Sequence, residues 1–279
     1  MSQIPCKEIV EKVIDGLKSC PIPKKILAAV LVGENSASIS FLKQKEKIAK
    51  ELGVDFRIYN FNDSPEEKLT NDELRQKINR ITNQKLVGGV IIQLPLPEQF
   101  NSQEILNAIP AKKDIDVLSE QALKDFNAGK GKILPPAVGV VEEILKTLNL
   151  KLGTLKVAVI GTGQLVGKPI AAWLKEKTAE LIILNSKTEN IKEELKNADI
   201  IISGAGKPNL FSAEDLKKNA IVIDFGYSLI NGKISGDFNP NSPIIQSSNS
   251  LKYTPTPGGT GPILVAKIME NFYKLANNK

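Results

Sequence analysis

Two kinds of segment alternate along the chain, and this alternation limits the possible folds more than any other feature. Short runs with apolar and β-branched residues, at residues 26–32, 55–60 and 87–93, are typical of strands. Longer stretches with helical spacing, at 37–52 and 65–82, lie between these runs. Because a strand, a helix and a second strand in succession join parallel strands by a right-handed crossover, the pattern predicts a parallel sheet flanked by helices.

The second half of the chain repeats the alternation. Strands are expected at 156–160, 180–184, 199–203 and 221–225, helices are expected to begin near Leu165, Thr188 and Ser212, and further helices are expected at 138–148 and 262–275. Asn231-Gly232, between two short apolar runs, indicates a hairpin turn, and the glycine-rich stretch 127–131 indicates a loop. We therefore predict an α/β protein of two domains, the second Rossmann-like, with a cleft between them that suits a ligand.

The N-terminal segment has the pattern of an amphipathic helix. Charged residues are spread through residues 1–20, unlike the uncharged core of a signal peptide. No apolar run approaches the roughly 20 residues that a membrane-spanning helix needs. We expect a soluble, cytoplasmic protein.

The chain contains no histidine, which removes several kinds of enzyme chemistry. Ser-His and Cys-His nucleophiles and His-ligated metal sites are excluded, so proton transfer falls to Lys, Asp, Glu, Tyr, Cys or water. Cys6 and Cys20 lie outside the spacings of metal ligands and redox pairs. We therefore expect two reduced thiols and no metal.

The net charge is +6, but it does not indicate a nucleic-acid partner. The lysines are scattered, and aromatic residues make up only 5% of the chain, which leaves few side chains for stacking on bases. A basic surface that attracts anionic small molecules is the better interpretation.

A glycine-rich loop follows the expected strand at 156–160. Gly161, Gly163 and Gly167 form a GxGxxxG pattern at a junction between a strand and a helix. Such a loop lets backbone N–H groups and a helix N-terminus approach a pyrophosphate without clashes from Cβ atoms. The alternative is a tight turn in a domain that binds no nucleotide.

The residues after the expected strand at 180–184 bear on the choice of dinucleotide. Folds that bind NAD usually place an Asp or Glu there for the ribose 2′-hydroxyl, whereas this chain has Ser186 and Lys187. These two side chains suit a 2′-phosphate and favour NADP. The alternative is that Ser186 or Thr188 merely caps the next helix.

Lys45 lies within an apolar stripe of the expected helix at 37–52. Phe41, Lys45, Ile48 and Leu52 recur at spacings of 4, 3 and 4 residues and share one face. A lysine on such a face either serves acid–base chemistry in a cleft or reaches past its neighbours to water. Periodicity alone favours the second interpretation.

Several segments in fixed order resemble one family. They are Val32-Gly33 with Ser36-Ala37-Ser38 and Phe41-Leu42-Lys43-Gln44-Lys45, then GVIIQLPLP at 89–97, KDID at 113–116, VGKP at 166–169, SKT at 186–188, GKP at 206–208, GD at 236–237 and TPTPGGTGP at 254–262. Together they are similar to the methylenetetrahydrofolate dehydrogenase/methenyltetrahydrofolate cyclohydrolases over nearly the whole chain.

The resemblance implies a folate-binding catalytic domain at residues 1–118, joined by a returning C-terminal helix at 259–279, and a Rossmann-like NAD(P)-binding domain at 119–258. It implies oxidation of 5,10-methylenetetrahydrofolate to 5,10-methenyltetrahydrofolate with NADP, NAD being the alternative, and hydrolysis of that product to 10-formyltetrahydrofolate. It also implies a homodimer. No metal, nucleic-acid or membrane partner is expected.

Site residues follow from the matched positions. The resemblance implies catalytic roles for Lys45, Gln93 and Asp116, and substrate binding by Phe41, Pro257, Gly258 and Gly259. It implies cofactor binding by Gly161, Thr162, Gly163, Gly167, Ser186, Lys187 and Tyr227. In this scheme Lys45 manages protons during water attack, Gln93 orients it, and Asp116 accepts hydrogen bonds from the pterin.

The chain departs from the family pattern at four places. Phe41 stands for the usual Tyr, Val117 for a Gly, residues 134–137 for PCTP, and Thr162-Gly163 for a frequent Arg-Ser. The missing hydroxyl at position 41 bears on the cyclohydrolase, and the missing Arg weakens the indication of NADP. Two alternatives follow: a dehydrogenase with weak cyclohydrolase, and a non-catalytic folate- or nucleotide-binding relative.

Overall fold

The computed structural model describes residues 1–61, 69–230, 232–241 and 250–277. The chain divides into two compact units. Unit 1 comprises Met1–Lys12 and Ala137–Leu264, and unit 2 comprises Val13–Pro136 and Val265–Lys279. These limits differ from the expected domain limits, because the division falls after Pro136 and the first 12 residues join unit 1. The assignment of 1–118 and 119–258 as functional domains stays a proposal.

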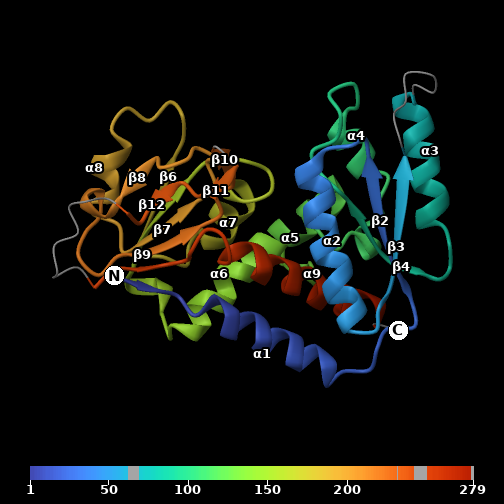
Figure 1. The fold of residues 1–279 in the computed structure, drawn as a ribbon, viewed down its shortest axis with the longest axis horizontal. Coiled ribbons are helices and arrows are strands. Elements are labelled where there is room, and N and C mark those ends of the chain that lie inside the picture. The colour runs from blue at the N-terminus through green and yellow to red at the C-terminus, as the bar shows by residue number, and fades with distance from the viewer. Residues whose placement is uncertain (62–68, 231, 242–249, 278–279) are drawn as a thin grey trace. The chain divides into compact units, whose positions relative to one another are not determined.

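Unit 2 is built on a three-stranded parallel sheet with the order β3-β2-β4 (Figure 1). Its strands are β2 (Ile26–Val32), β3 (Asp55–Phe61) and β4 (Val87–Ile92). The helices are α2 (Ser36–Glu51), α3 (Asn71–Thr82), α4 (Ser102–Leu106) and α5 (Glu120–Asn127), with a 3-10 turn, η1 (Ala111–Lys113). Parts of α1 (Cys6–Lys18) and α9 (Thr260–Ala276) complete it.

The central strand explains the core of unit 2. Every residue of β2 is buried, as its unbroken apolar sequence requires, whereas β3 alternates between exposed and partly buried positions and forms an edge. Residues Ala28 and Val30 pack in one cluster with Leu74 and Ile78 of α3. Burial of this apolar surface fixes the sheet that positions the residues at its carboxyl edge.

Helix starts in unit 2 follow local capping. The Asn35 side chain accepts a hydrogen bond from the N–H of Ser38 at the start of α2, and Thr70 forms a capping box with Glu73 at the start of α3. The helix expected at 65–82 is confirmed from Asn71, while its first positions lie outside the described residues.

Unit 1 contains a six-stranded, fully parallel sheet with the order β1-β13-β9-β7-β5-β6. Its strands are β1 (Ser2–Gln3), β5 (Lys156–Ile160), β6 (Glu180–Leu184), β7 (Ile200–Ser203), β9 (Ile221–Asp224) and β13 (Lys252–Tyr253). The expected strands are thus confirmed within one or two residues. Strand β6 lies on one side of β5 and β7 on the other, so the connections reverse direction at β5.

Smaller elements complete unit 1. They are the parallel pair β8 (Phe211–Ser212) and β12 (Phe238–Asn239), the antiparallel hairpin β10 (Ser228–Ile230) and β11 (Lys233–Ser235), the helices α6 (Pro136–Thr147), α7 (Gly167–Leu174) and α8 (Ile191–Leu195), and the 3-10 turns η2 (Leu152–Thr154) and η3 (Ala213–Asp215). The expected hairpin is confirmed, although Asn231 of its turn lies outside the described residues.

One expected helix is wrong. The segment after Ser212 forms only the short turn η3, and the chain then enters β9 at Ile221. Asn219 adopts a left-handed conformation with φ of 65°, which ends any helical path before the strand. Helices α7 and α8 begin two and three residues after the positions expected for them. Among the described residues, no helix has the length and apolar character to cross a membrane.

Candidate active site

Lys45 is buried on α2, with only 3% of its surface exposed. The buried face of α2 consists of Ser38, Leu42, Lys45 and Ala49, whereas Phe41 is only partly buried. Of the expected stripe, Lys45 and Leu52 are buried and Phe41 and Ile48 are partly buried, so the stripe borders the buried face of the helix. The interpretation that Lys45 reaches out to water is wrong.

Gln93 holds the Lys45 ammonium in place. The Lys45 Nζ donates a hydrogen bond of 2.9 Å to Gln93 Oε1, and Gln93 Nε2 donates one of 2.9 Å to the carbonyl oxygen of Leu94. The second bond turns the amide so that its oxygen faces the lysine. Gln93 follows β4, and its N–H donates to Val30 O, so the sheet itself positions this amide.

Phe41 lies one turn before Lys45, and the Lys45 Nζ is 4.8 Å from the centre of its ring. This distance is within the range of a cation–π contact. The ring therefore supports the ammonium, but it has no hydroxyl to exchange a proton with it.

The KDID segment brings a carboxylate to Lys45, and each of its residues has a separate task. Lys113 Nζ donates to the carbonyl oxygens of two residues at the end of α3, and Asp114 Oδ2 accepts from the N–H groups of Leu118 and Ser119. Ile115 is fully buried, and its carbonyl oxygen accepts from Asn271 Nδ2. Only Asp116 is left to act on Lys45.

Lys45 and Asp116 shift each other's pKa. Burial lowers the pKa of Lys45, and the nearby Asp116 carboxylate opposes this. Burial raises the pKa of Asp116 from 3.8 to about 6, with Lys45 lowering it and Asp114 raising it. Because neither group is in its ordinary environment, the pair suits acid–base chemistry.

Val117 occupies a conformation that favours glycine, with φ of 57°. Its side chain is 2% exposed and packs with Ala122 and Ile133 rather than standing in the surroundings of Lys45. The valine therefore strains the backbone locally, because β-branched residues rarely adopt positive φ. The altered 134–137 segment lies at the start of α6, where the Leu134 carbonyl oxygen accepts from Asn271.

The glycine-rich loop lies at the carboxyl end of β5 in unit 1. Gly161 has φ of 96°, and its N–H donates to Leu184 O at the end of β6. A Cβ on Gly167, the first residue of α7, would collide with the carbonyl oxygen of Gly161, whereas a Cβ on Gly163 would meet no atom within 4 Å. Thr162 and Gly163 are exposed. The loop is thus tightly folded at its ends and open in its middle.

This position fits a dinucleotide. In open α/β sheets, ligands bind beyond the carboxyl ends of the strands where the connections reverse, which is at β5 here. Backbone N–H groups and the start of α7 face that edge without a Cβ at Gly163. Ser186 and Lys187 are exposed in the turn after β6. Thr188 accepts from the N–H of Asn185 rather than capping α8, whose N-cap is Asn190.

Asp237 shapes the loop beside the glycine-rich loop, a role that the sequence pattern did not predict. It is fully buried and accepts hydrogen bonds from the Ser203 hydroxyl at 2.6 Å and from the N–H groups of Ala205 and Lys207, both at 2.8 Å. Ser203 ends β7, and Ala205 and Lys207 belong to the loop that follows it, next to the glycine-rich loop. The GD segment matched in the sequence gave its position, but no pattern indicated its partners.

Pro257, Gly258 and Gly259 belong to unit 1, at the carboxyl end of β9. Thr254 Oγ1 accepts from the N–H of Asp224, and Thr260 Oγ1 donates to the carbonyl oxygen of Asp224, both at 2.8 Å. The two threonines thus tie both ends of the segment to one strand.

The structure therefore forms two groups of the predicted residues. Unit 2 brings together Phe41, Lys45, Gln93 and Asp116. Unit 1 holds the glycine-rich loop, Ser186, Lys187, Tyr227 and the segment Pro257–Gly259 at loops that follow its strands, Tyr227 being 55% exposed. Among the described residues, no group of three or more Cys, Asp or Glu side chains could hold a metal ion.

Two family models match the chain. One, described as tetrahydrofolate dehydrogenase/cyclohydrolase, catalytic domain, matches residues 4–116. The other, described as tetrahydrofolate dehydrogenase/cyclohydrolase, NAD(P)-binding domain, matches residues 135–279. Their division corresponds to the two groups of residues above.

Curated relatives and solved structures agree with these models. The bifunctional protein FolD of Clostridium botulinum (strain Alaska E43 / Type E3) is 35% identical over 265 residues, covering 95% of this chain and 92% of that protein. The bifunctional protein FolD of Bdellovibrio bacteriovorus is 36% identical over 255 residues, covering 91% and 86%. The crystal structure of the bifunctional enzyme FolD from Campylobacter jejuni has a TM-score of 0.86 and 32% identity, covering 98% and 96%.

Proposed function

The chain belongs to the tetrahydrofolate dehydrogenase/cyclohydrolase family, and we propose that it oxidises 5,10-methylenetetrahydrofolate with NADP and hydrolyses the product to 10-formyltetrahydrofolate. The observation that carries this proposal is the buried Lys45 ammonium, fixed by Gln93 and acted on by Asp116. A buried cation oriented in this way is expensive to fold and is typical of a functional group.

Lys45 serves as the proton-handling group of the hydrolysis. Its ammonium has three N–H donors, and among the described residues only Gln93 accepts a hydrogen bond from it, which leaves donors for the folate. Water adds to the methenyl carbon and loses a proton, which leaves a hydroxyl on that carbon. The hydroxyl then loses its proton to form the formyl C=O as the C–N bond of the ring breaks and that nitrogen gains a proton. Because burial lowers its pKa, Lys45 exchanges these protons more readily than an exposed lysine.

Asp116 binds the pterin. As a carboxylate it accepts hydrogen bonds from the pterin's amino and ring N–H groups. With a pKa of about 6, it is mostly ionised at neutral pH. Phe41 packs beside the ammonium and offers its ring to the folate. In unit 1, the resemblance to the family assigns folate binding to Pro257, Gly258 and Gly259.

The dinucleotide, when bound, accepts the hydride, and the chain holds and orients it. The loop from Gly161 to Gly167 cradles the pyrophosphate, and Ser186 and Lys187 contact the 2′-phosphate of NADP. Tyr227, after β9, contributes to the same site. Position 162 holds Thr instead of an Arg that could pair with the 2′-phosphate, so NAD is the second candidate cofactor.

The protein acts in the cytoplasm as a homodimer. Support for association comes from the β10–β11 hairpin, where Leu229 is 67% exposed and Ile230 is 38% exposed. Leu229 is the more exposed of the two, and covering an apolar side chain of this size with another chain is favourable. Light scattering of the Leu229→Asp variant tests this, because a dimer formed through the hairpin dissociates on that change.

A dehydrogenase with weak cyclohydrolase is the second candidate function, and Phe41 favours it. The missing hydroxyl deprives Lys45 of a neighbour that could relay protons. An assay of both steps with NADP and with NAD separates the two candidates, since only the first requires release of 10-formyltetrahydrofolate at a comparable rate. Tight folate binding without any turnover would instead indicate a non-catalytic relative.

The Lys45→Met variant tests the main proposal. The Met side chain is about as long as that of Lys and can be buried because it carries no charge. We therefore expect the rate of hydrolysis to fall by about 100-fold or more while the fold remains. Lys47→Met is the matched control, because Lys47 is exposed on the same helix. Unchanged hydrolysis in Lys45→Met, or an equal loss in the control, would remove the role assigned to Lys45.

A further inference from the structure

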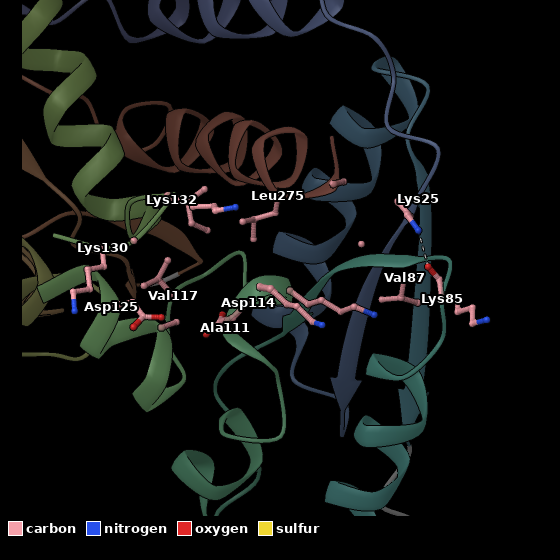
Figure 2. Close-up of a pocket in the computed structure, with 17 residues that line it drawn as sticks. Lys25, Lys85, Val87, Ala111, Asp114, Val117, Asp125, Lys130, Lys132 and Leu275 are labelled. Atoms are coloured by element: carbon pink, nitrogen blue, oxygen red, sulfur yellow. Dashed lines mark hydrogen bonds between the residues drawn. The ribbon is translucent and has the colours of Figure 1, made fainter. Parts of the chain in front are cut away.

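Unit 2 contains a pocket of about 510 Å³ (Figure 2). Its walls come from the segment before β2, the start of β4, η1, the loop at 130–133 and the end of α9. Val87 and Gly88 mark the amino end of β4, whereas Gln93 follows its carboxyl end. At about 3.3 Å per residue, six residues of strand separate the two positions by about 20 Å. The pocket is therefore not part of the Lys45 site.

Lysines dominate the lining of this pocket. They are Lys25, Lys85, Lys112, Lys113, Lys130 and Lys132, against two acidic residues, Asp114 and Asp125. The buried Asp114 carboxylate accepts hydrogen bonds from the N–H groups of Leu118 and Ser119, and Asp125 accepts one from the Gln121 side chain. Over the part of the chain that the structure describes, none of the six lysines forms an ion pair with a carboxylate. The positive charge of the pocket is thus not neutralised from within.

Two of the lysines have structural partners, and four do not. Lys25 Nζ donates to Lys85 O, and Lys113 Nζ donates to Thr82 O and Gln84 O at the end of α3. The ammonium groups of the other four, Lys85, Lys112, Lys130 and Lys132, have no hydrogen-bond partner among the described side chains and backbone groups. Burial and repulsion from Lys112 and Lys25 lower the pKa of Lys113, which reflects the same uncompensated charge.

Close packing at Gly88 brings the segment of Lys25 against β4 and the end of α9. A Cβ on Gly88 would lie 2.7 Å from Lys25 Cβ and 3.1 Å from Ala276 Cβ, so the absence of a side chain there lets three segments meet. In Figure 2, Lys25 and Lys85 stand at one end of the pocket, and Lys130 and Lys132 stand toward the other. The charges therefore surround a space instead of covering a flat surface.

We propose that this pocket binds a small anion that carries two or more phosphate groups. The lining offers six lysines, and each ammonium is a compact point charge that can bind phosphate oxygens. The volume admits a small molecule. Two groups of lysines at its two ends match an anion whose charge is spread over several phosphates.

Isothermal titration with tripolyphosphate tests the proposal. The titration is run with NADP at saturation, so that the glycine-rich loop of unit 1 is filled. We expect saturable binding that weakens as salt is raised. Lys112→Ala/Lys132→Ala removes two unpartnered lysines and should weaken binding by about tenfold or more, because hydrogen bonds to charged groups are the strong ones.

Lys24→Ala/Lys218→Ala is the matched control, since both lysines are exposed outside the pocket and the loss of net charge is the same. Full binding by this control, with loss in the pocket variant, supports the proposal. Absence of binding, or equal weakening in both variants, would overturn it. ATP in a parallel titration distinguishes the sources: tighter binding than tripolyphosphate indicates a nucleotide, and equal binding indicates the phosphate chain alone.

Discussion

Replacing Asp116 by Asn should stabilise the protein at neutral pH while it removes activity. The carboxylate is partly exposed and lies near a lysine that does not fully compensate for its lost hydration, since desolvation is the largest influence on its pKa. Asn has nearly the same shape without the charge. The functional carboxylate is therefore held at a cost in stability, as is common at active sites.

The size of the effect follows from the pKa. A rise from 3.8 to about 6 means that ionising Asp116 costs about 3 kcal/mol more in the folded protein than in the unfolded chain. Because Asn must place its own amide in the same site, we expect a gain of about 1–3 kcal/mol. For chains of this size that corresponds to roughly 2–4 °C in the unfolding midpoint per kcal/mol.

The pH dependence gives the prediction its sign. A carboxyl group with a raised folded pKa stabilises the fold below its unfolded pKa, near 3.8, and this stability is lost as pH rises through about 6. The variant has no such loss. Its advantage over the natural chain should therefore be small near pH 4, grow between pH 4 and 6, and be complete above pH 7.

Differential scanning calorimetry at pH 4.5, 6.0 and 7.5 measures this advantage. The Lys45→Met background separates the two influences: without the ammonium, Asp116→Asn should stabilise more, by the coupling energy of the pair. A variant that is less stable than the natural chain at pH 7.5, or a gain that is the same at all three pH values, would refute the reasoning from burial.

Three further predictions concern single contacts. Gly167→Ala should prevent dinucleotide binding or folding, because its Cβ collides with the Gly161 carbonyl oxygen, whereas Gly163→Ala, in open space, should leave the melting temperature unchanged; fluorescence titration with NADPH and a melting curve check both. Asp237→Ala should lower the free energy of unfolding of unit 1, measured in urea, by roughly 3 kcal/mol, because three hydrogen-bond donors lose their acceptor. A loss below about 1 kcal/mol would contradict this. Phe41→Tyr should raise hydrolysis without changing hydride transfer, and an equal effect on both steps would argue against a proton relay at this position.

The sequence alone determined the positions of the strands and of the glycine-rich loop that follows β5. Strands such as 26–32 and 156–160 were placed correctly because continuous apolar runs of this length are stable only when buried between helices. The glycine pattern after β5 was also sufficient, since a Cβ at Gly167 is sterically impossible in that turn. Propensity was less reliable after Ser212, where the chain forms only the turn η3 and Asn219 adopts a left-handed conformation before β9.

Tertiary structure decided which charged groups serve the site. Periodicity identified a lysine on the apolar face of α2 but favoured its escape to water, because the partner amide of Gln93 lies 48 residues away. Asp114 and Asp116 are alike in sequence, yet one binds the N–H groups of its own loop and the other acts on Lys45. A local sequence pattern reflects only interactions between residues that are close along the chain. The hydration and the pKa of a charged side chain depend instead on all the groups that lie near it in the folded structure.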